Sequence, residues 1–90
     1  MNYALNDNIA TLTLDDGKAN AVSHTLIDEL NAALDQAETE ASALVLLGRP
    51  GVFSAGFDLK EIQKGAEASA ALVGRGAEMF YRLFNYPLPL

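Results

Sequence analysis

An apolar segment that leads into a loop of small residues and then into a helix start constrains this fold most. Ala43–Leu47 contains no polar residue, which is typical of a strand covered on both faces. The loop after it contains Ser54–Gly56, where Gly56 can adopt a positive φ, and Asp58 is suited to cap a helix. Backbone N–H groups at such a strand-to-helix junction lack intrahelical partners. The segment therefore predicts a turn that can bind an anion or stabilise a developing oxyanion.

The N-terminal part of the chain predicts a hairpin followed by a helix. Tyr3–Leu5 and Ile9–Leu14 read as strands, joined by a turn at Asn6–Asn8. Ser23 is the expected N-cap of a helix that runs to about Glu38. Its expected buried stripe consists of Leu26, Leu30, Ala33, Leu34 and Ala37.

The C-terminal third predicts two more helices and the start of a strand. A short helix is expected from Asp58 to about Lys64, and a longer one from about Ala68 to Tyr86. The expected apolar side of the longer helix comprises Leu72, Met79, Phe80, Leu83 and Phe84. Gly74 and Gly76 weaken a helix interior by roughly 1 kcal/mol each. They indicate close packing, a break between two helices, or a mobile lid.

Composition limits the class of protein. Ninety residues suffice for one small domain, and the net charge of −6 argues against a nucleic-acid-binding surface. The absence of cysteine excludes disulfides, thiolate metal sites and a cysteine nucleophile. No apolar run has the length of a membrane span, and no export signal pattern begins the chain. We therefore expect a cytoplasmic protein without a membrane partner.

Several common catalytic patterns are missing from the sequence. Ser54 lies in G-x-x-S-x-G, which differs from the G-x-S-x-G nucleophile elbow. His24 is the only histidine, and nothing in the sequence pairs it with a nucleophile, so we expect it to be exposed to solvent. No phosphate-binding glycine loop and no cluster of metal ligands is visible, so no metal site is predicted.

Two segments carry a resemblance to a known family. Phe53–Leu59, FSAGFDL, resembles the F-[SCA]-A-G-x-D-[LI] signature of the crotonase (enoyl-CoA hydratase/isomerase) superfamily. Lys18–Ser23, KANAVS, resembles the family segment [KPR]-x-N-A-[LVFM]-[ST], which opens its first long helix. The resemblance extends from Tyr3 to Pro89. It implies an α/β fold, the N-terminal portion of a crotonase-like spiral of ββα units.

The resemblance also implies a site. It assigns the backbone N–H of Phe57 to the oxyanion hole that holds the thioester oxygen, although the residues alone also allow an ordinary turn with a buried aromatic. The Phe57 ring either lines the acyl pocket or packs in the core. Asp58 is better read as a helix cap than as a catalytic acid. The residues implied to lie near substrate or coenzyme A are Lys18, Ala19, Ala21, Ala55, Gly56, Phe57, Asp58, Leu59 and Lys60.

The expected activity follows from the same resemblance. It is that of an acyl-CoA enzyme, an enoyl-CoA hydratase (a lyase) that adds water to a 2-enoyl-CoA through an oxyanion-stabilised enolate. An enoyl-CoA isomerase, another acyl-thioester enzyme of the family, and a catalytically silent fragment or scaffold stay open as alternatives. No tightly bound cofactor is expected, since coenzyme A belongs to the substrate. The family implies a homotrimer or a dimer of trimers.

The segment Asn85–Leu90 reads as a helix stop followed by the first residues of another apolar strand. We therefore expect residues 1–90 to be the N-terminal part of a crotonase-like domain, truncated before the second half of the active site. The acid/base residues and the second oxyanion donor are then expected beyond Leu90, and residues 1–90 alone are expected to be inactive.

Overall fold

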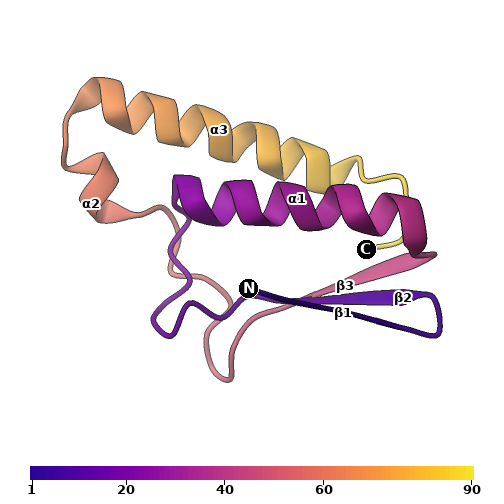
Figure 1. The fold of residues 1–90 in the computed structure, drawn as a ribbon. Helices are drawn as coiled ribbons and strands as arrows, with labels where there is room; N and C mark the ends of the chain where they lie inside the picture. The colour runs from indigo at the N-terminus through magenta and orange to yellow at the C-terminus, as the bar shows by residue number, and fades with distance from the viewer.

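The computed structural model describes all residues from Met1 to Leu90. The elements follow in the order β1 (Asn2–Asn6), β2 (Ile9–Thr13), α1 (His24–Glu40), β3 (Ala43–Leu47), α2 (Leu59–Ile62) and α3 (Ala66–Phe84). The three strands form one layer, and the two long helices lie side by side in another (Figure 1). No helix combines the length and the apolar character needed to cross a membrane.

The sheet has the order β1-β2-β3 and is mixed. β1 and β2 are antiparallel, and the turn between them places Asp7 at φ 53° and Asn8 at φ 64°. Two successive left-handed residues match the twist that a tight hairpin requires, and Asn and Asp tolerate this conformation. β2 and β3 are parallel, so α1 crosses over between them. The predicted hairpin and the β-β-α-β order are confirmed.

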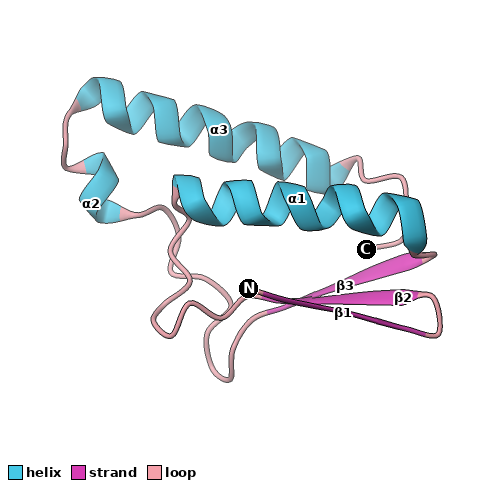
Figure 2. Ribbon diagram, in the orientation of Figure 1, coloured by secondary structure: helices cyan, strands magenta, loops and turns pink.

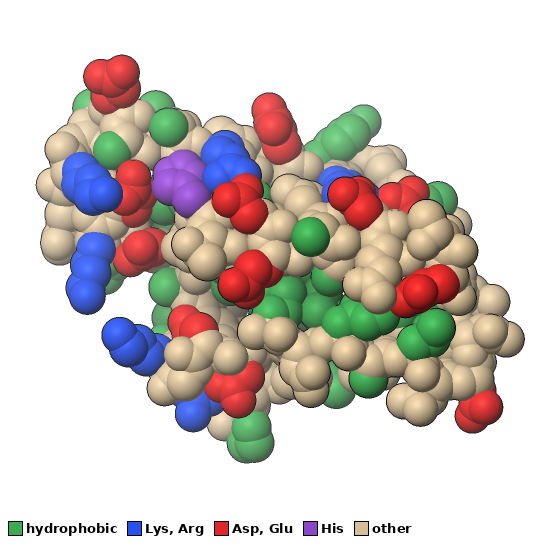
Figure 3. All heavy atoms as spheres, in the orientation of Figure 1, with side chains coloured by type: hydrophobic (Ala, Val, Ile, Leu, Met, Phe, Trp, Pro, Cys, Tyr) green, Lys and Arg blue, Asp and Glu red, His purple; other side chains and the backbone are tan.

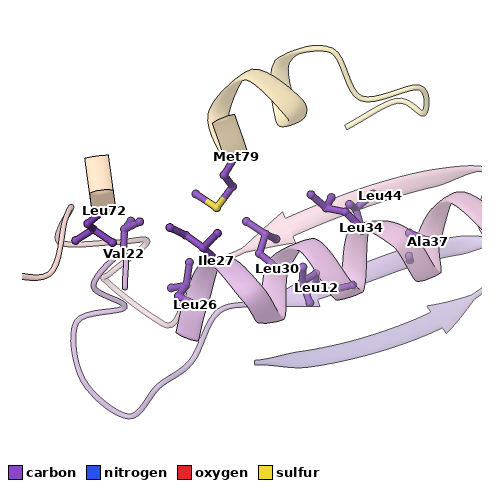
Figure 4. Packing of buried hydrophobic residues seen from close by; sticks show 12 residues of the cluster. Leu12, Val22, Leu26, Ile27, Leu30, Leu34, Ala37, Leu44, Leu72 and Met79 are labelled. Carbon is purple, nitrogen blue, oxygen red and sulfur yellow. The ribbon is translucent and has the colours of Figure 1, made fainter. Parts of the chain in front are cut away.

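The main core lies between α1 and the sheet. Ser23 caps α1, with its Oγ accepting a hydrogen bond from the Leu26 N–H at 3.1 Å. The predicted stripe of α1 is buried throughout, and Ile27 joins it. It packs against Leu12 of β2 and Leu44 of β3 (Figure 4). Helix periodicity therefore located the buried side of α1 correctly.

The expectation that β3 is covered on both faces is wrong for this structure. Leu44 is buried, whereas Val45 is 42% exposed and Leu47 is 46% exposed. Ile9 of β2 lies on the same open face, because its register partner in β3 is Ala43. The helices cover one face of the sheet, and no segment of residues 1–90 covers the other (Figure 2).

The long C-terminal helix is continuous through Gly74 and Gly76, so a break between two helices, one of the three alternatives for these glycines, is not observed. α3 begins two residues earlier than expected and also ends two residues earlier. Gly76 is buried against another side chain, which confirms close packing at that position, whereas Gly74 has no neighbour in the space of a side chain.

The expected apolar side of α3 is only partly buried. Leu72 and Met79 are buried and Leu83 is half-buried, but Phe80 is 48% exposed and Phe84 is 89% exposed. α3 packs against α1 and α2, and these contacts leave Phe80 and Phe84 without full cover. Arg82 strengthens this contact, donating to Asp35 at 2.6 Å and to Glu38 at 2.8 Å on α1.

The segment after α3 turns back to the sheet. The Tyr86 hydroxyl donates to the Leu34 carbonyl at 2.6 Å. The Leu44 N–H then donates to the Pro89 carbonyl at 2.9 Å. The last residues thus lie along the edge of β3, where the predicted strand would pair, although they do not themselves form a regular strand.

Candidate active site

The two motif segments lie side by side, joined by backbone hydrogen bonds. The Ala55 N–H donates to the Ala19 carbonyl at 2.9 Å. The Val22 N–H donates to the Gly56 carbonyl at 2.8 Å, and the Asp58 N–H donates to the Val22 carbonyl at 2.9 Å. Both loops leave the sheet at the same end (Figure 2). The structure thus brings the predicted residues of the two motifs together.

Asn20 holds the two loops together from the inside. It is 1% exposed and adopts a φ of 53°. Its Nδ2 donates to the Leu14 carbonyl at 2.8 Å and to the Phe53 carbonyl at 3.0 Å, and its Oδ1 accepts from the Asp16 N–H at 3.0 Å. Sequence reasoning placed Asn20 in a motif but gave it no role. The signal that could have indicated a role is that asparagine tolerates left-handed backbone, here three residues before the predicted helix cap Ser23.

Ser54 makes a second connection between the loops. Its Oγ donates to the Asn20 carbonyl at 2.8 Å and accepts from the Gly56 N–H at 3.1 Å. Sequence reasoning placed Ser54 in a loop of small residues and gave it no further role. The structure shows that it also fixes the turn, in which Gly56 has the predicted positive φ of 91°.

The Phe57 N–H is the donor of interest at this turn. It donates no hydrogen bond within the chain, whereas the N–H groups of Gly56 and Asp58 on either side both do. The bonds from Val22 to Gly56 and from Asp58 to Val22 hold the backbone before and after this donor. The geometry therefore presents one fixed and unpartnered N–H group.

The Phe57 ring packs against α3. Its centroid is 6.2 Å from that of Phe80, with an interplanar angle of 63°, an edge-to-face arrangement. The ring also lies against Gly76 and contacts the main hydrophobic cluster. Of the two alternatives for this ring, core packing is the one observed.

An apolar cleft of about 370 Å³ reaches the same turn. Leu26 and Leu30 of α1 form one wall, and Met79 and Leu83 of α3 form another. Gly56 contributes to its lining, so the cleft begins one residue from the Phe57 N–H. Such a cleft can accept an apolar chain next to a polar donor.

Two cations stand free near the loops. Lys18 and Lys60 are exposed, and the ammonium group of neither makes an ion pair. Lys and Arg side chains lie on both sides of a hollow at the left of Figure 3. Asp58 caps α2 by accepting from the Lys60 N–H at 3.1 Å, which confirms its predicted capping role. The other predicted contact residues are placed at the surface, with Ala19, Ala55 and Leu59 exposed and Ala21 half-buried.

A polar cluster joins α2 to the long helices. Lys64 Nζ lies 2.7 Å from Glu61 Oε2, and His24 Nε2 lies 3.6 Å from Glu61 Oε1. Arg75 donates to His24 Nδ1 at 2.9 Å and also pairs with Asp28. The expectation that His24 is exposed to solvent holds only in part: its side chain is 37% exposed, and Arg75 of α3 supplies a partner across the helix pair. No group of three or more His, Asp and Glu side chains is arranged to hold a metal ion.

The pKa of Glu61 predicts a pH-dependent contribution to stability. The hydrogen bond from Lys64 lowers the pKa of Glu61 against the opposing effect of burial, and the charge of Lys64 lowers it further. A carboxylate with a lowered pKa stabilises the fold above its unfolded pKa of about 4.3, and this stabilisation is lost as the pH falls through the folded value. In the complete protein, Glu61→Gln should therefore lower the Tm at neutral pH, and the difference from wild type should disappear in acid.

The measurement is the Tm of thermal unfolding, recorded from neutral pH down to a pH below the ordinary pKa of glutamate. Glu78→Gln is the matched control, since Glu78 is exposed and makes no ion pair. If the Tm of Glu61→Gln stayed below that of wild type by the same amount across this pH range, an electrostatic role for the carboxylate would be contradicted.

Known proteins resemble this chain along its whole length. A sequence model of the family described as "Enoyl-CoA hydratase/isomerase" matches residues 4–90. A probable enoyl-CoA hydratase of Bacillus subtilis is 36% identical over 94 residues, covering 100% of this chain and 36% of that protein. A probable enoyl-CoA hydratase of Rhodobacter capsulatus is 31% identical over 90 residues, covering 98% of this chain and 35% of that protein. The chain thus spans about a third of the length of these relatives.

Solved structures agree in fold. An enoyl-CoA hydratase/isomerase family protein of Pseudomonas syringae superposes with a TM-score of 0.90 at 45% identity, covering 94% of this chain and 37% of that one. A probable enoyl-CoA hydratase of Mycobacterium tuberculosis gives 0.91 at 41% identity, covering 98% and 38%. A second structure of the same M. tuberculosis protein, described there as an enoyl-CoA isomerase, gives a TM-score of 0.90 at 40% identity and covers 98% of this chain and 38% of that one. The predicted crotonase-like α/β fold is confirmed, and the chain belongs to the enoyl-CoA hydratase/isomerase family.

Proposed function

We propose that the complete protein is an acyl-CoA enzyme, an enoyl-CoA hydratase that adds water to a 2-enoyl-CoA. The observation that carries this proposal is the unpartnered Phe57 N–H, which is held between two backbone hydrogen bonds and directly follows Gly56, a residue that lines an apolar cleft. An acyl thioester needs both features, since its carbonyl oxygen accepts a hydrogen bond and its chain is apolar.

The Phe57 N–H would act on the thioester oxygen. When water attacks the β-carbon, a C–O bond forms and the C=C π pair moves toward the carbonyl. Negative charge then accumulates on the thioester oxygen as an enolate, and a preorganised N–H stabilises this charge more than it stabilises the substrate. The attacking water loses one proton to a base as the C–O bond forms, and the enolate collapses when a proton reaches the α-carbon. We assign both proton transfers to groups outside residues 1–90, and together they complete the addition of water.

The loop surface would hold coenzyme A. Lys18 and Lys60 are free to meet phosphate oxygens, and the small side chains of Ala19, Ala21 and Ala55 leave room for the carrier next to the backbone. Gly56, Asp58 and Leu59 complete the proposed contact region. No tightly bound cofactor is part of this proposal, because coenzyme A arrives with the substrate.

We propose that residues 1–90 form the N-terminal part of a crotonase-like domain, with the second oxyanion donor and the acid/base groups supplied outside them. This is supported by the share of each curated relative that the chain covers, 36% and 35%. It is also supported by the glutamates: Glu61, which is close to the loops, is engaged by Lys64 and His24. A homotrimer or dimer of trimers and a cytoplasmic location are further proposals that rest on the family resemblance.

Enoyl-CoA isomerisation is the second candidate, because the similar M. tuberculosis structure bears that description. It uses the same oxyanion but moves the double bond without adding water. A catalytically silent scaffold is a third candidate, in which the turn is only structural.

The test is to titrate the complete protein with coenzyme A and then with 2-enoyl and 3-enoyl thioesters. A hydratase should bind coenzyme A saturably and convert crotonyl-CoA to the 3-hydroxyacyl product. Formation of 2-enoyl product from the 3-enoyl substrate alone would favour the isomerase. Binding without turnover of either thioester would favour the scaffold.

A further inference from the structure

The Phe57 ring and the backbone of Gly76 occupy adjoining space between the turn and α3. A Cβ placed on Gly76 would lie 2.4 Å from Phe57 Cε1 and 2.7 Å from Cζ, so the ring fills the position of a side chain at residue 76. Gly74, two residues earlier on the same helix, would meet nothing within 4 Å. The two glycines are therefore chemically alike but differ in their surroundings.

The Phe57 ring packs against other groups besides Gly76. Phe80 meets it edge-to-face, and Phe57 also packs against the main hydrophobic cluster. The residues on either side of Phe57 are bonded to Val22, which is itself buried. A side chain on α3 that displaced the ring would therefore act on the short segment that orients the Phe57 N–H.

We propose that Gly76 is a positioning residue for the oxyanion donor, because the absence of its side chain lets the Phe57 ring seat against α3 without displacing the Phe57 N–H, which the bonds to Val22 hold in place. This inference deepens the proposed function and rests on it. It also makes the side chains at 57 and 76 interdependent in size, since a larger residue at one position requires a smaller one at the other.

The test combines single and double variants of the complete protein. Gly76→Ala should lower kcat about tenfold to a hundredfold with little change in KM, because a misplaced donor weakens the transition state most. Gly74→Ala, the matched control, should leave kcat unchanged and raise the Tm, because it gains helix propensity without a clash. Adding Phe57→Ala to Gly76→Ala should restore kcat to the level of Phe57→Ala alone, since the alanine keeps the N–H and removes the ring.

Thermal unfolding of the same four proteins measures the packing independently of activity. A Tm deficit of Gly76→Ala that Phe57→Ala relieves, together with the same pattern in kcat, supports the proposal. A Tm deficit with unchanged kcat would overturn it, because the ring would then move without the donor. If Gly76→Ala does not fold, a double variant that folds but stays as slow as a donor-free protein would also overturn it.

A different variant, Phe57→Pro, tests the proposed function itself. A folded Phe57→Pro variant with normal turnover would reject the oxyanion role itself, and the positioning role with it. Loss of turnover in Phe57→Pro together with normal turnover in Gly76→Ala would reject the positioning role alone.

Discussion

Replacing Phe57 with proline in the complete protein should lower turnover roughly a hundredfold, equivalent to about 3 kcal/mol of transition-state stabilisation. Proline lacks the N–H that we assign to the thioester oxygen, and the N–H groups on either side cannot replace it, because those of Gly56 and Asp58 are already bonded. The loss should fall on kcat, since the oxygen carries most charge in the transition state. Steady-state kinetics with a 2-enoyl-CoA measures it.

Phe57→Ala is the matched control because it keeps the donor and removes the ring. The ring packs against Gly76 and Phe80, so its loss should reduce stability by less than the ~3–5 kcal/mol typical of a fully buried phenylalanine. Turnover should largely persist, and any change in acyl-chain preference would come indirectly, through α3. Proline also restricts Gly56, so circular dichroism and thermal melting must show that both variants are folded. Equal losses in two folded variants would instead assign the effect to the ring.

Replacing Asn20 with alanine should destabilise the protein by roughly 2–4 kcal/mol. The side chain is buried, and its removal leaves the Leu14 and Phe53 carbonyls without their donor and the Asp16 N–H without its acceptor. An unsatisfied buried polar group costs about 1–3 kcal/mol, and alanine also tolerates the positive φ at this position poorly. Chemical denaturation of the complete protein measures the loss.

Asn20→Gly separates the two causes, because glycine accepts a φ of 53° but makes none of the side-chain hydrogen bonds. Most of the deficit should remain in the glycine variant. A glycine variant as stable as wild type would mean that backbone conformation, and not the hydrogen bonds, explains the requirement for asparagine.

Sequence patterns predicted the elements that depend on interactions between residues close together in the chain. The hairpin follows from Asn and Asp residues that accept left-handed backbone, and α1 follows from a serine cap and a stripe at helical spacing. The same kind of pattern misjudged β3, because an apolar strand does not state which of its faces another segment will cover. Phe80 and Phe84 were misassigned for the same reason.

The sequence predicted where the candidate site lies, but not which side chains hold its loops in place. Its position came from two motifs, whereas Asn20 went unassigned because one of its partners, the Phe53 carbonyl, lies 33 positions away. The alternatives for the Phe57 ring could be decided only once the path of α3 was known, since Gly76 is the surface on which the ring rests. Contacts of this kind depend on how helices pack and leave no local signal.

Val22 has a consequence for ligand binding that extends beyond the turn. It bonds to the backbone on both sides of Phe57 and directly precedes the Ser23 cap of α1. Backbone hydrogen bonds thus connect the turn at Phe57 to the start of a long helix, so we expect fraying of either segment to weaken the other. A ligand that engages the turn must then also raise the free energy needed to open the first turn of α1. By linkage, the factor by which opening that helix end weakens ligand binding equals the factor by which the bound ligand suppresses the opening.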